Sequence, residues 1–249
     1  PLIASLNEKL STISPVPKTA AAVNIAYLAS QAGIPTLLWD LDPQGAASWY
    51  LAGTDEIKGR KLAALMDGKT PIGKFIRASA YPDLDFIPAH NSFRNLDVRL
   101  DKDDSANTLK NWLAPLSEET SLVVLDCPPS MSRLSEQVLK TADGVFVPVV
   151  PTWLALNSWQ QLQAFAKDKK LKPGRLHPFF SIVDRRKNLH REMVIHRKQR
   201  LENGLNALIP NASVVEKMGE SGQPVELMDR SSAAADAYRR LWKEIRKLI

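Results

Sequence analysis

The distribution of apolar and polar residues along the 249-residue chain predicts an alternation of strands and helices. Short apolar runs favour buried strands, and the segments between them place apolar residues at helical spacing. The expected strands are 2–6, 35–42, 84–90, 121–129, 144–151, 178–183 and a short strand near Val214. The expected helices are 19–33, 61–68, 106–116, 132–141, 156–167, a basic helix between 185 and 200, and a final helix from about residue 233.

This alternation predicts an α/β fold with a doubly wound, mostly parallel sheet and helices on both faces. No linker, internal repeat or low-complexity tract interrupts it, so residues 1–249 are expected to form a single domain. Ligands of such sheets bind at the carboxyl ends of the strands. Candidate chemistry is therefore sought just after each apolar run.

The first strand leads to Lys18 and Thr19, which open an alanine-rich helix. In a phosphate-binding loop, the lysine reaches the terminal phosphates, the adjacent hydroxyl binds magnesium, and the helix N-terminus presents free N–H groups to the anion. Lys18, Thr19 and Ala20 are therefore candidate nucleotide ligands, with Thr19 also a candidate magnesium ligand. A Lys-Thr pair is common, so this signal is weak alone.

The second strand end carries two acids in the sequence LLWDLDPQG. Because alternate residues of a strand point to opposite faces, Asp40 and Asp42 can point the same way only if the chain turns between them. Asp40 is a candidate magnesium ligand, and Asp42 a candidate catalytic residue that orients the attacking water. The alternative for Asp42 is a helix cap or turn residue.

The third strand end, LVVLDCPPS, places Asp126 after four apolar residues. This is the Walker B pattern, in which a strand-end carboxylate holds magnesium. Many unrelated α/β proteins also end an apolar strand in aspartate. The order of the three strand ends along the chain is therefore more specific than any one of them.

The charge is unevenly distributed, with a formal net charge of +6 and a pI near 9.4. Residues 167–200 contain twelve Lys and Arg but only three acids. A patch this basic suits DNA, although a solvated helix face is the alternative. The candidate DNA-binding residues are Arg185, Arg186, Lys187, Arg191, Arg197, Lys198 and Arg200, and helical spacing is expected to put several of them on one face.

No apolar run is long enough to span a bilayer, no leader peptide opens the given sequence, and Cys127 is the single cysteine. These features favour a cytoplasmic, nucleoid-associated protein without a membrane span. The final helix is amphipathic and basic, which is compatible with a membrane surface. Packing of its apolar face on the sheet is the favoured alternative.

The Lys-Thr helix start, DLDPQG and DCPPS together resemble the ParA/MinD family of deviant Walker ATPases, and DLDPQG and DCPPS favour the ParA branch. GVFVPVVPTWLALNS and SIVDRRKNLHREMV resemble further family segments, so the resemblance covers nearly the whole chain. It implies a P-loop NTPase-like, ATP- and Mg²⁺-dependent homodimer. It also implies nonspecific DNA binding and a ParB-like partner in the segregation of plasmid, chromosome or other cargo.

The expected phosphate loop departs from the family sequence KGGVGKT, because ISPVPKT contains no glycine. Two alignments remain open. One leaves no counterpart for the family's signature lysine, which reaches the partner's ATP, and the other assigns that catalytic role to Lys9. In both, Pro15 and Pro17 lack N–H donors and have a fixed φ, so a standard phosphate cradle is not expected.

Two functions therefore remain open from the sequence. The first is a ParA-like partition ATPase with weak or atypical ATP binding and hydrolysis. The second is a pseudo-ATPase, a DNA-binding or scaffold protein that no longer uses ATP.

Overall fold

The computed structural model describes residues 1–5, 16–52, 64–65, 70–96, 98, 100, 107–128, 132–170 and 175–249. Within these residues, eight strands form one sheet in the order β3-β4-β2-β5-β1-β6-β7-β8. All neighbouring strands are parallel except the pair β3–β4. The strands are β1 (Leu2–Ser5), β2 (Thr36–Asp40), β3 (Arg77–Ala78), β4 (Leu84–Ile87), β5 (Leu122–Asp126), β6 (Gly144–Val149), β7 (Leu176–Val183) and β8 (Leu208–Pro210).

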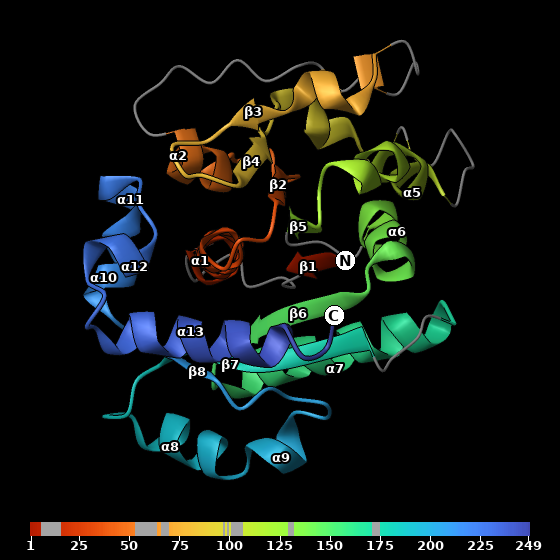
Figure 1. Cartoon of the computed structure of the whole chain (residues 1–249). Helices are drawn as coiled ribbons and strands as arrows, with labels where there is room; N and C mark the ends of the chain where they lie inside the picture. Colours follow the sequence, from red (N-terminus) through yellow and green to blue (C-terminus); the bar gives the residue numbers. More distant parts are fainter. Residues whose placement is uncertain are drawn as a thin grey trace.

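Helices connect the strands and cover both faces of the sheet (Figure 1). The longer ones are α1 (Val16–Gln31), α6 (Arg133–Thr141), α7 (Trp153–Asp168), α8 (Asn188–Ile195) and α13 (Ala233–Ile245). The shorter α-helices are α2 (Ala46–Ala52), α5 (Thr108–Leu113), α9 (Arg197–Arg200), α10 (Ser213–Glu216), α11 (Met218–Ser221) and α12 (Val225–Met228). The 3₁₀ turns are η1 (Ile72–Phe75), η2 (Asn91–Asn95) and η3 (Ala114–Glu118).

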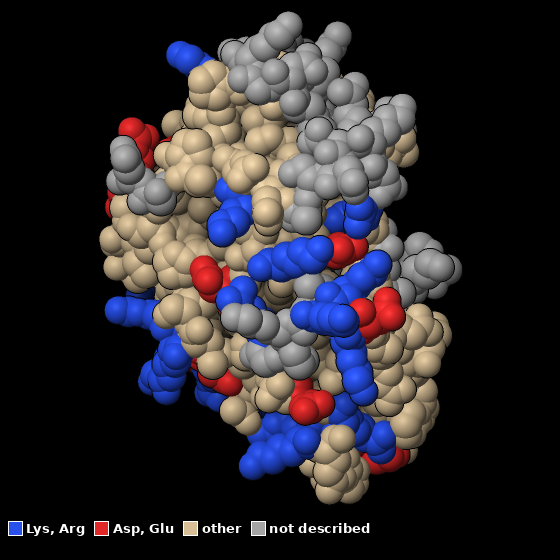
Figure 2. Space-filling model, turned by 90° about the vertical axis from the view of Figure 1, so that its right-hand side faces the viewer, with Lys and Arg blue, Asp and Glu red and all other residues tan. Residues whose placement is uncertain are grey.

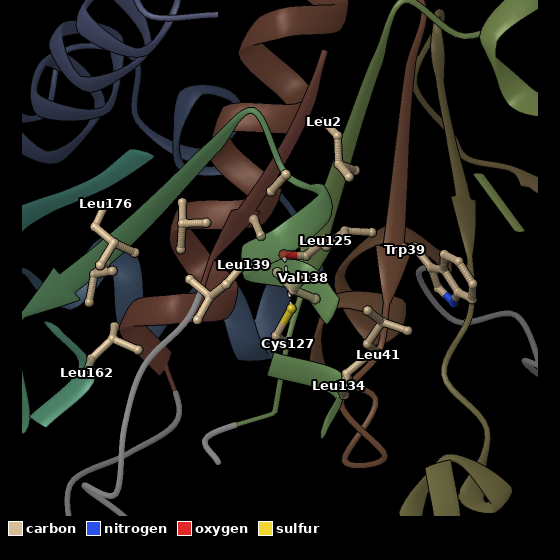
Figure 3. Packing of buried hydrophobic residues seen from close by; sticks show 14 of the residues in the cluster. Leu2, Trp39, Leu41, Leu125, Cys127, Leu134, Val138, Leu139, Leu162 and Leu176 are labelled. Carbon is tan, nitrogen blue, oxygen red and sulfur yellow. Dashed lines mark hydrogen bonds between the residues drawn. The ribbon is translucent and has the colours of Figure 1, made fainter. Parts of the chain in front are cut away.

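The central strands are buried on both faces, and their side chains alternate between two apolar clusters. Leu37 and Trp39 pack on the face covered by α5, α6 and α7, whereas Leu38 packs on the face covered by α1, α2 and α13. Figure 3 shows the first cluster, in which Leu134 and Val138 of α6 lie near Leu125 and Cys127. This confirms the expected doubly wound, mostly parallel sheet.

Three local expectations differ from the structure. Val214 lies in α10 rather than in a strand, because Val215 and Met218 turn inward at helical spacing and are buried. The last strand instead lies earlier, at β8. The first long helix begins at Val16 rather than at residue 19. The expected basic helix is divided into α8 and α9, which are separated by His196.

The final helix packs one face on the sheet, with Tyr238, Leu241, Trp242 and Ile245 buried. This confirms the favoured alternative for its amphipathic pattern. No helix among the described residues combines the length and apolar character that crossing a bilayer requires.

Candidate functional site

Three strand ends meet at one edge of the sheet and form the candidate site. β5 lies between β1 and β2, and in the parallel register Asp126 is opposite both Ser5 and Asp40. The helix α1 follows β1 and carries Lys18 and Thr19 in its first turn. The structure therefore brings Lys18, Thr19 and the carboxylates of Asp40, Asp42 and Asp126 together, as expected from the sequence.

Thr19 and Asp126 are in direct contact. The Thr19 hydroxyl donates a hydrogen bond of 2.7 Å to Oδ2 of Asp126. The other oxygen of Asp126, Oδ1, is buried without a hydrogen-bond partner among the described residues, and it lies 3.9 Å from Nζ of Lys18. A hydroxyl beside a carboxylate with a spare oxygen is a donor set that fits Mg²⁺, which prefers oxygen ligands and usually binds one or two carboxylates together with phosphate oxygens. Thr19 and Asp126 would hold the ion.

Lys18 is buried, and the chain itself supplies its partners. Its ammonium group lies 2.9 Å from Oδ2 of Asp42 and also donates to the carbonyl of Cys127. Burial alone would lower the pKa of Lys18, but the charges of Asp126 and Asp42 outweigh it, and the pKa is raised. Lys18 is therefore cationic at neutral pH. Its ammonium group, which in a phosphate loop would bind the nucleotide, is paired with Asp42 instead.

Asp42 also organises the turn that follows β2. Its Oδ1 accepts a hydrogen bond of 3.0 Å from the backbone N–H of Gln44, and its carbonyl accepts one of 2.9 Å from Gly45. Gly45 has φ +70°, a conformation that glycine adopts without strain. Asp42 therefore stabilises this turn, as the alternative interpretation from the sequence expected, and it is also the partner of Lys18.

Asp40 is fully buried, as Asp126 is, but both of its carboxylate oxygens already accept hydrogen bonds. Oδ2 accepts hydrogen bonds from the backbone N–H (2.8 Å) and hydroxyl (2.7 Å) of Ser48, and Oδ1 accepts one of 3.2 Å from the backbone N–H of Asp42. Burial, and after it the charge of Asp126, raises the pKa of Asp40 to about 7. The structure therefore favours a role for Asp40 in holding the start of α2, rather than the expected metal-binding role.

Some site residues stand apart from this arrangement. Lys9 lies outside the described residues, and the side chain of Ala20 is fully buried in the core on the α1 face. Sequence reasoning missed Ser48, which lies eight positions after Asp40 at the start of α2. It also missed the Cys127 carbonyl, because main-chain acceptors leave no signal in the sequence. The Cys127 thiol is buried near Leu125 (Figure 3), and burial raises its pKa, so it is not a reactive thiol.

The expected DNA-binding residues lie on the loop after β7 and on α8 and α9. Arg185, Lys187 and Lys198 are exposed. Arg186 is exposed too, but it forms a two-pronged ion pair with Asp184, at 2.9 Å for both contacts, and this contact lowers the pKa of Asp184 to about 2.

The remaining arginines of this group have partners within the chain. Arg191 contacts Asn188, and Arg197 donates to Asn206 at 3.0 Å. Arg200 pairs with Glu192 at 3.0 Å, and its guanidinium carbon lies 4.5 Å from the ring centroid of Trp153. The expected single helix is divided at His196, and Lys187 is the N-cap of α8. That several of these charges share one face stays a prediction.

The chain is similar in sequence to known proteins over most of its length. Residues 3–174 match the family described as an AAA domain. The chain is 30% identical over 238 residues to the chromosome-partitioning ATPase Soj of Treponema pallidum, covering 92% of each chain. It is also 30% identical over 247 residues to the chromosome partitioning protein ParA of Myxococcus xanthus, covering 93% of this chain and 84% of the relative.

Solved structures share the fold at lower identity. Apo McdA from Cyanothece superposes with a TM-score of 0.79 at 19% identity, covering 98% of this chain and 99% of that one. The septum site-determining protein MinD from Pyrococcus horikoshii OT3, complexed with Mg-ADP, has a TM-score of 0.79 at 17% identity, covering 99% and 96%. With the Lys18, Thr19 and Asp126 arrangement, these matches show that the chain belongs to the ParA/MinD family of Walker ATPases.

Proposed function

We propose that this chain is a ParA-like partition protein that binds ATP with Mg²⁺ weakly or atypically and binds DNA without sequence preference. The contact between Thr19 and the half-satisfied carboxylate of Asp126, beside Lys18, carries the nucleotide part of this proposal. The partition roles named for the Soj and ParA relatives support the cellular part.

Each site residue has a proposed task. Lys18 and the N-terminus of α1 bind the phosphates, and Thr19 and Asp126 hold the metal. Bound nucleotide with its metal supplies a polarised terminal phosphoryl group. Asp42 orients the attacking water once Lys18 has left it. Asp40 supports this edge through Ser48 and is no longer proposed as a ligand.

We also propose that the chain works as a homodimer through the carboxyl edge of the sheet. Trp153 and Leu154 begin α7 directly after β6, at the same edge as Lys18, and are 58% and 60% exposed. Exposed apolar side chains of this size favour a protein partner. A ParB-like protein is the proposed second partner. All 249 residues are proposed to act as one domain, which the continuous sheet supports.

A pseudo-ATPase remains the second candidate function, favoured by one specific observation. Lys18 has its charge balanced inside the protein, by Asp42 and the Cys127 carbonyl. A chain that had lost ATP binding would need such internal partners to keep a buried cation stable.

Calorimetric titration with ATP and Mg²⁺ separates the two functions. The partition ATPase predicts measurable binding that weakens at least about tenfold in Thr19→Ala, because a metal ligand is removed. Ser232→Ala, which removes the cap of α13, is the matched control and should bind like the wild type. No binding by either protein would support the pseudo-ATPase, whereas equal binding by both would show that Thr19 does not hold the metal.

A further inference from the structure

The basic segment that the sequence presents as one run folds into two surfaces at opposite ends of the sheet. The strand β7 divides it, and its eight residues span about 25 Å. Arg185–Arg200 follow the carboxyl end of β7, whereas 167–175 precede its amino end. Figure 2 shows the right-hand side of Figure 1, where α6 and α7 end, and Lys and Arg side chains gather across its centre.

We define the amino-end surface by the six cations that α6, the end of α7 and the start of β7 bring together. They are Arg133, Lys140, Lys167, Lys169, Lys170 and Arg175.

Glu136 joins the two helices within this surface. Its carboxylate lies 2.6 Å from Nζ of Lys140, 3.3 Å from Nη1 of Arg133 and 3.6 Å from Nζ of Lys169. The hydrogen bond from Lys140 is the largest of the causes that lower the pKa of Glu136, so the carboxylate stays ionised. Three cations therefore share one negative charge, and the contact to Lys169 fixes the end of α7 against α6.

The surface carries more positive charge than its acids neutralise. The described residues 132–143, 167–170 and 175 hold six cations and three acids. Of these acids, Asp143 accepts a hydrogen bond of 2.9 Å from the backbone N–H of Leu2. Arg175 donates to the carbonyl of Ala142 at 2.8 Å and so keeps its charge. The end of the chain after α13 adds exposed Lys247 close by, since Ile249 packs at Gly144.

We propose that the amino-end surface is a second DNA-binding surface, which contacts duplex phosphates independently of the surface formed by Arg185, Lys187 and Lys198. Four of its six cations are lysines, which protein interfaces contain less often than the rest of the surface and which suit a phosphate backbone. Arg175 and Arg185 flank the eight residues of β7 and so lie about 25 Å apart along the strand, beyond the Debye length of about 8 Å. Arg185 therefore contacts phosphates separately from the amino-end surface.

The position of this surface decides what it can do. It lies at the end of the sheet opposite Lys18 and Asp126, so a dimer formed through the carboxyl edge leaves it exposed. One molecule could then hold two duplexes at once. The choice of DNA as the ligand rests on the proposed partition function.

A two-duplex capture experiment tests the proposal. One duplex is fixed to beads, a fluorescent duplex of unrelated sequence is added, and the label retained by the full chain is measured at low salt. The amino-end variant replaces three exposed lysines that do not contact Glu136, namely Lys167→Gln and Lys170→Gln within the surface and Lys247→Gln beside it. The matched control removes as many charges at the other end, namely Arg185→Gln, Lys187→Gln and Lys198→Gln. Affinity for one duplex is measured in parallel by anisotropy.

We expect the amino-end variant to lose at least about tenfold of the captured label while its single-duplex affinity falls less than about threefold, because one set of phosphate contacts remains. The matched control should lose single-duplex affinity at least about tenfold. Full capture by the amino-end variant would overturn the proposal, since the dimer would then bridge through its carboxyl-end surfaces alone. Strong single-duplex binding without any capture would overturn it too and leave the partition function intact. No binding of any duplex would overturn both this proposal and the proposed DNA-binding function. Binding of the amino-end surface to poly-glutamate but not to DNA would overturn DNA as its ligand and indicate an acidic protein instead.

Discussion

At the scale of single residues, the ion pair between Lys18 and Asp42 is the main determinant of the site. Both side chains are buried, and the Nζ to Oδ2 distance is 2.9 Å. Removing one partner of a buried pair leaves an uncompensated charge, which costs up to about 3–5 kcal/mol. Here the Cys127 carbonyl and Asp126 remain beside Lys18, so the cost should be smaller.

We therefore predict that Asp42→Asn lowers the free energy of unfolding by about 1–3 kcal/mol without nucleotide, because Lys18 loses its closest anion. The same variant should lose any ATP turnover, since Asp42 is proposed to orient water. Urea denaturation and phosphate release measure the two effects. Asp236→Asn, which removes an exposed partner of Arg240, is the control and should change neither. Unchanged stability in Asp42→Asn would show that the pair is not formed in solution.

The second prediction concerns Asp40 and pH. Its pKa in the folded chain is raised from the ordinary 3.8 to about 7, so the native state holds a proton that the unfolded chain has released. Stability should therefore fall as the pH rises from about 5 to 8, by on the order of 2–3 kcal/mol. Lys18, Asp42 and Asp126 face the same site, and burial raises the pKa of Asp126 as well, so the variant at Asp40 is needed to isolate its contribution. Denaturation of Asp40→Asn at both pH values is the check, and its stability should lose most of this dependence.

The residue scale also shows what sequence can predict. Lys18, Thr19, Asp42 and Asp126 were predicted to meet because each follows an apolar strand, and parallel strands end at one edge. The sequence did not predict that Asp40 is held by Ser48, or that Lys18 donates to the Cys127 carbonyl. Those contacts depend on side-chain direction and main-chain position, which a linear pattern does not encode.

At the scale of elements, the start of α1 changes how the prolines act. The helix begins at Val16, so Pro17 lies in the first turn, where a backbone N–H has no partner within the helix. Pro17 therefore costs the helix little. It still removes an N–H that could reach a phosphate.

We predict that Pro17→Gly strengthens ATP binding by about tenfold, the effect of one charge-assisted hydrogen bond. Replacing 14–17 with the glycine-rich family sequence should strengthen it further. Calorimetry measures both variants. Pro224→Gly, at the N-cap of α12, is the control and adds no donor at the phosphate site. If neither loop variant gains affinity, the glycine-free loop is not what limits nucleotide binding.

The loop between β7 and α8 yields a prediction that distinguishes two adjacent arginines. Arg185 is exposed and lines a groove of about 570 Å³ with β8 and α13, whereas Arg186 is held by Asp184. Arg185→Gln combined with Lys187→Gln should flatten the salt dependence of DNA binding by about one to two units, since each phosphate contact contributes nearly one. Arg186→Gln is the control and should change the slope by much less. Fluorescence anisotropy across a salt series decides, and an equal effect of both variants would contradict the assignment.

The basic segment and α10 show why some helices of this chain are harder to predict than its central strands. The apolar runs of β5 and β6 are unambiguous, because both faces are buried. The basic segment has few apolar residues to fix a period, so its division at His196 was not foreseen. Val214 was misplaced for a similar reason, since β-branched residues favour strands locally and the inward turn of Val215 overrides that preference.

At the scale of the whole molecule, the exposed apolar residues predict where two copies meet. Leu154→Asp should weaken the proposed dimer at least about tenfold, because a charge would be buried at the carboxyl edge. Ile195→Asp is the matched control, since Ile195 is 75% exposed on α8 and is not assigned to the interface. Analytical ultracentrifugation with and without ATP and Mg²⁺ measures both. Equal dimerisation of the wild type and Leu154→Asp would place the interface elsewhere.

The internal partner of Lys18 has a consequence for how the protein responds to its ligand. A carboxylate fixed 2.9 Å from the ammonium acts as a tethered competitor whose effective concentration no dilution can lower. The observed ATP affinity is then the intrinsic affinity reduced by the strength of that contact. We expect variants that bind nucleotide more tightly through a weakened Asp42 contact to be less stable when empty, so that ligand sensitivity and resting stability change in opposite directions.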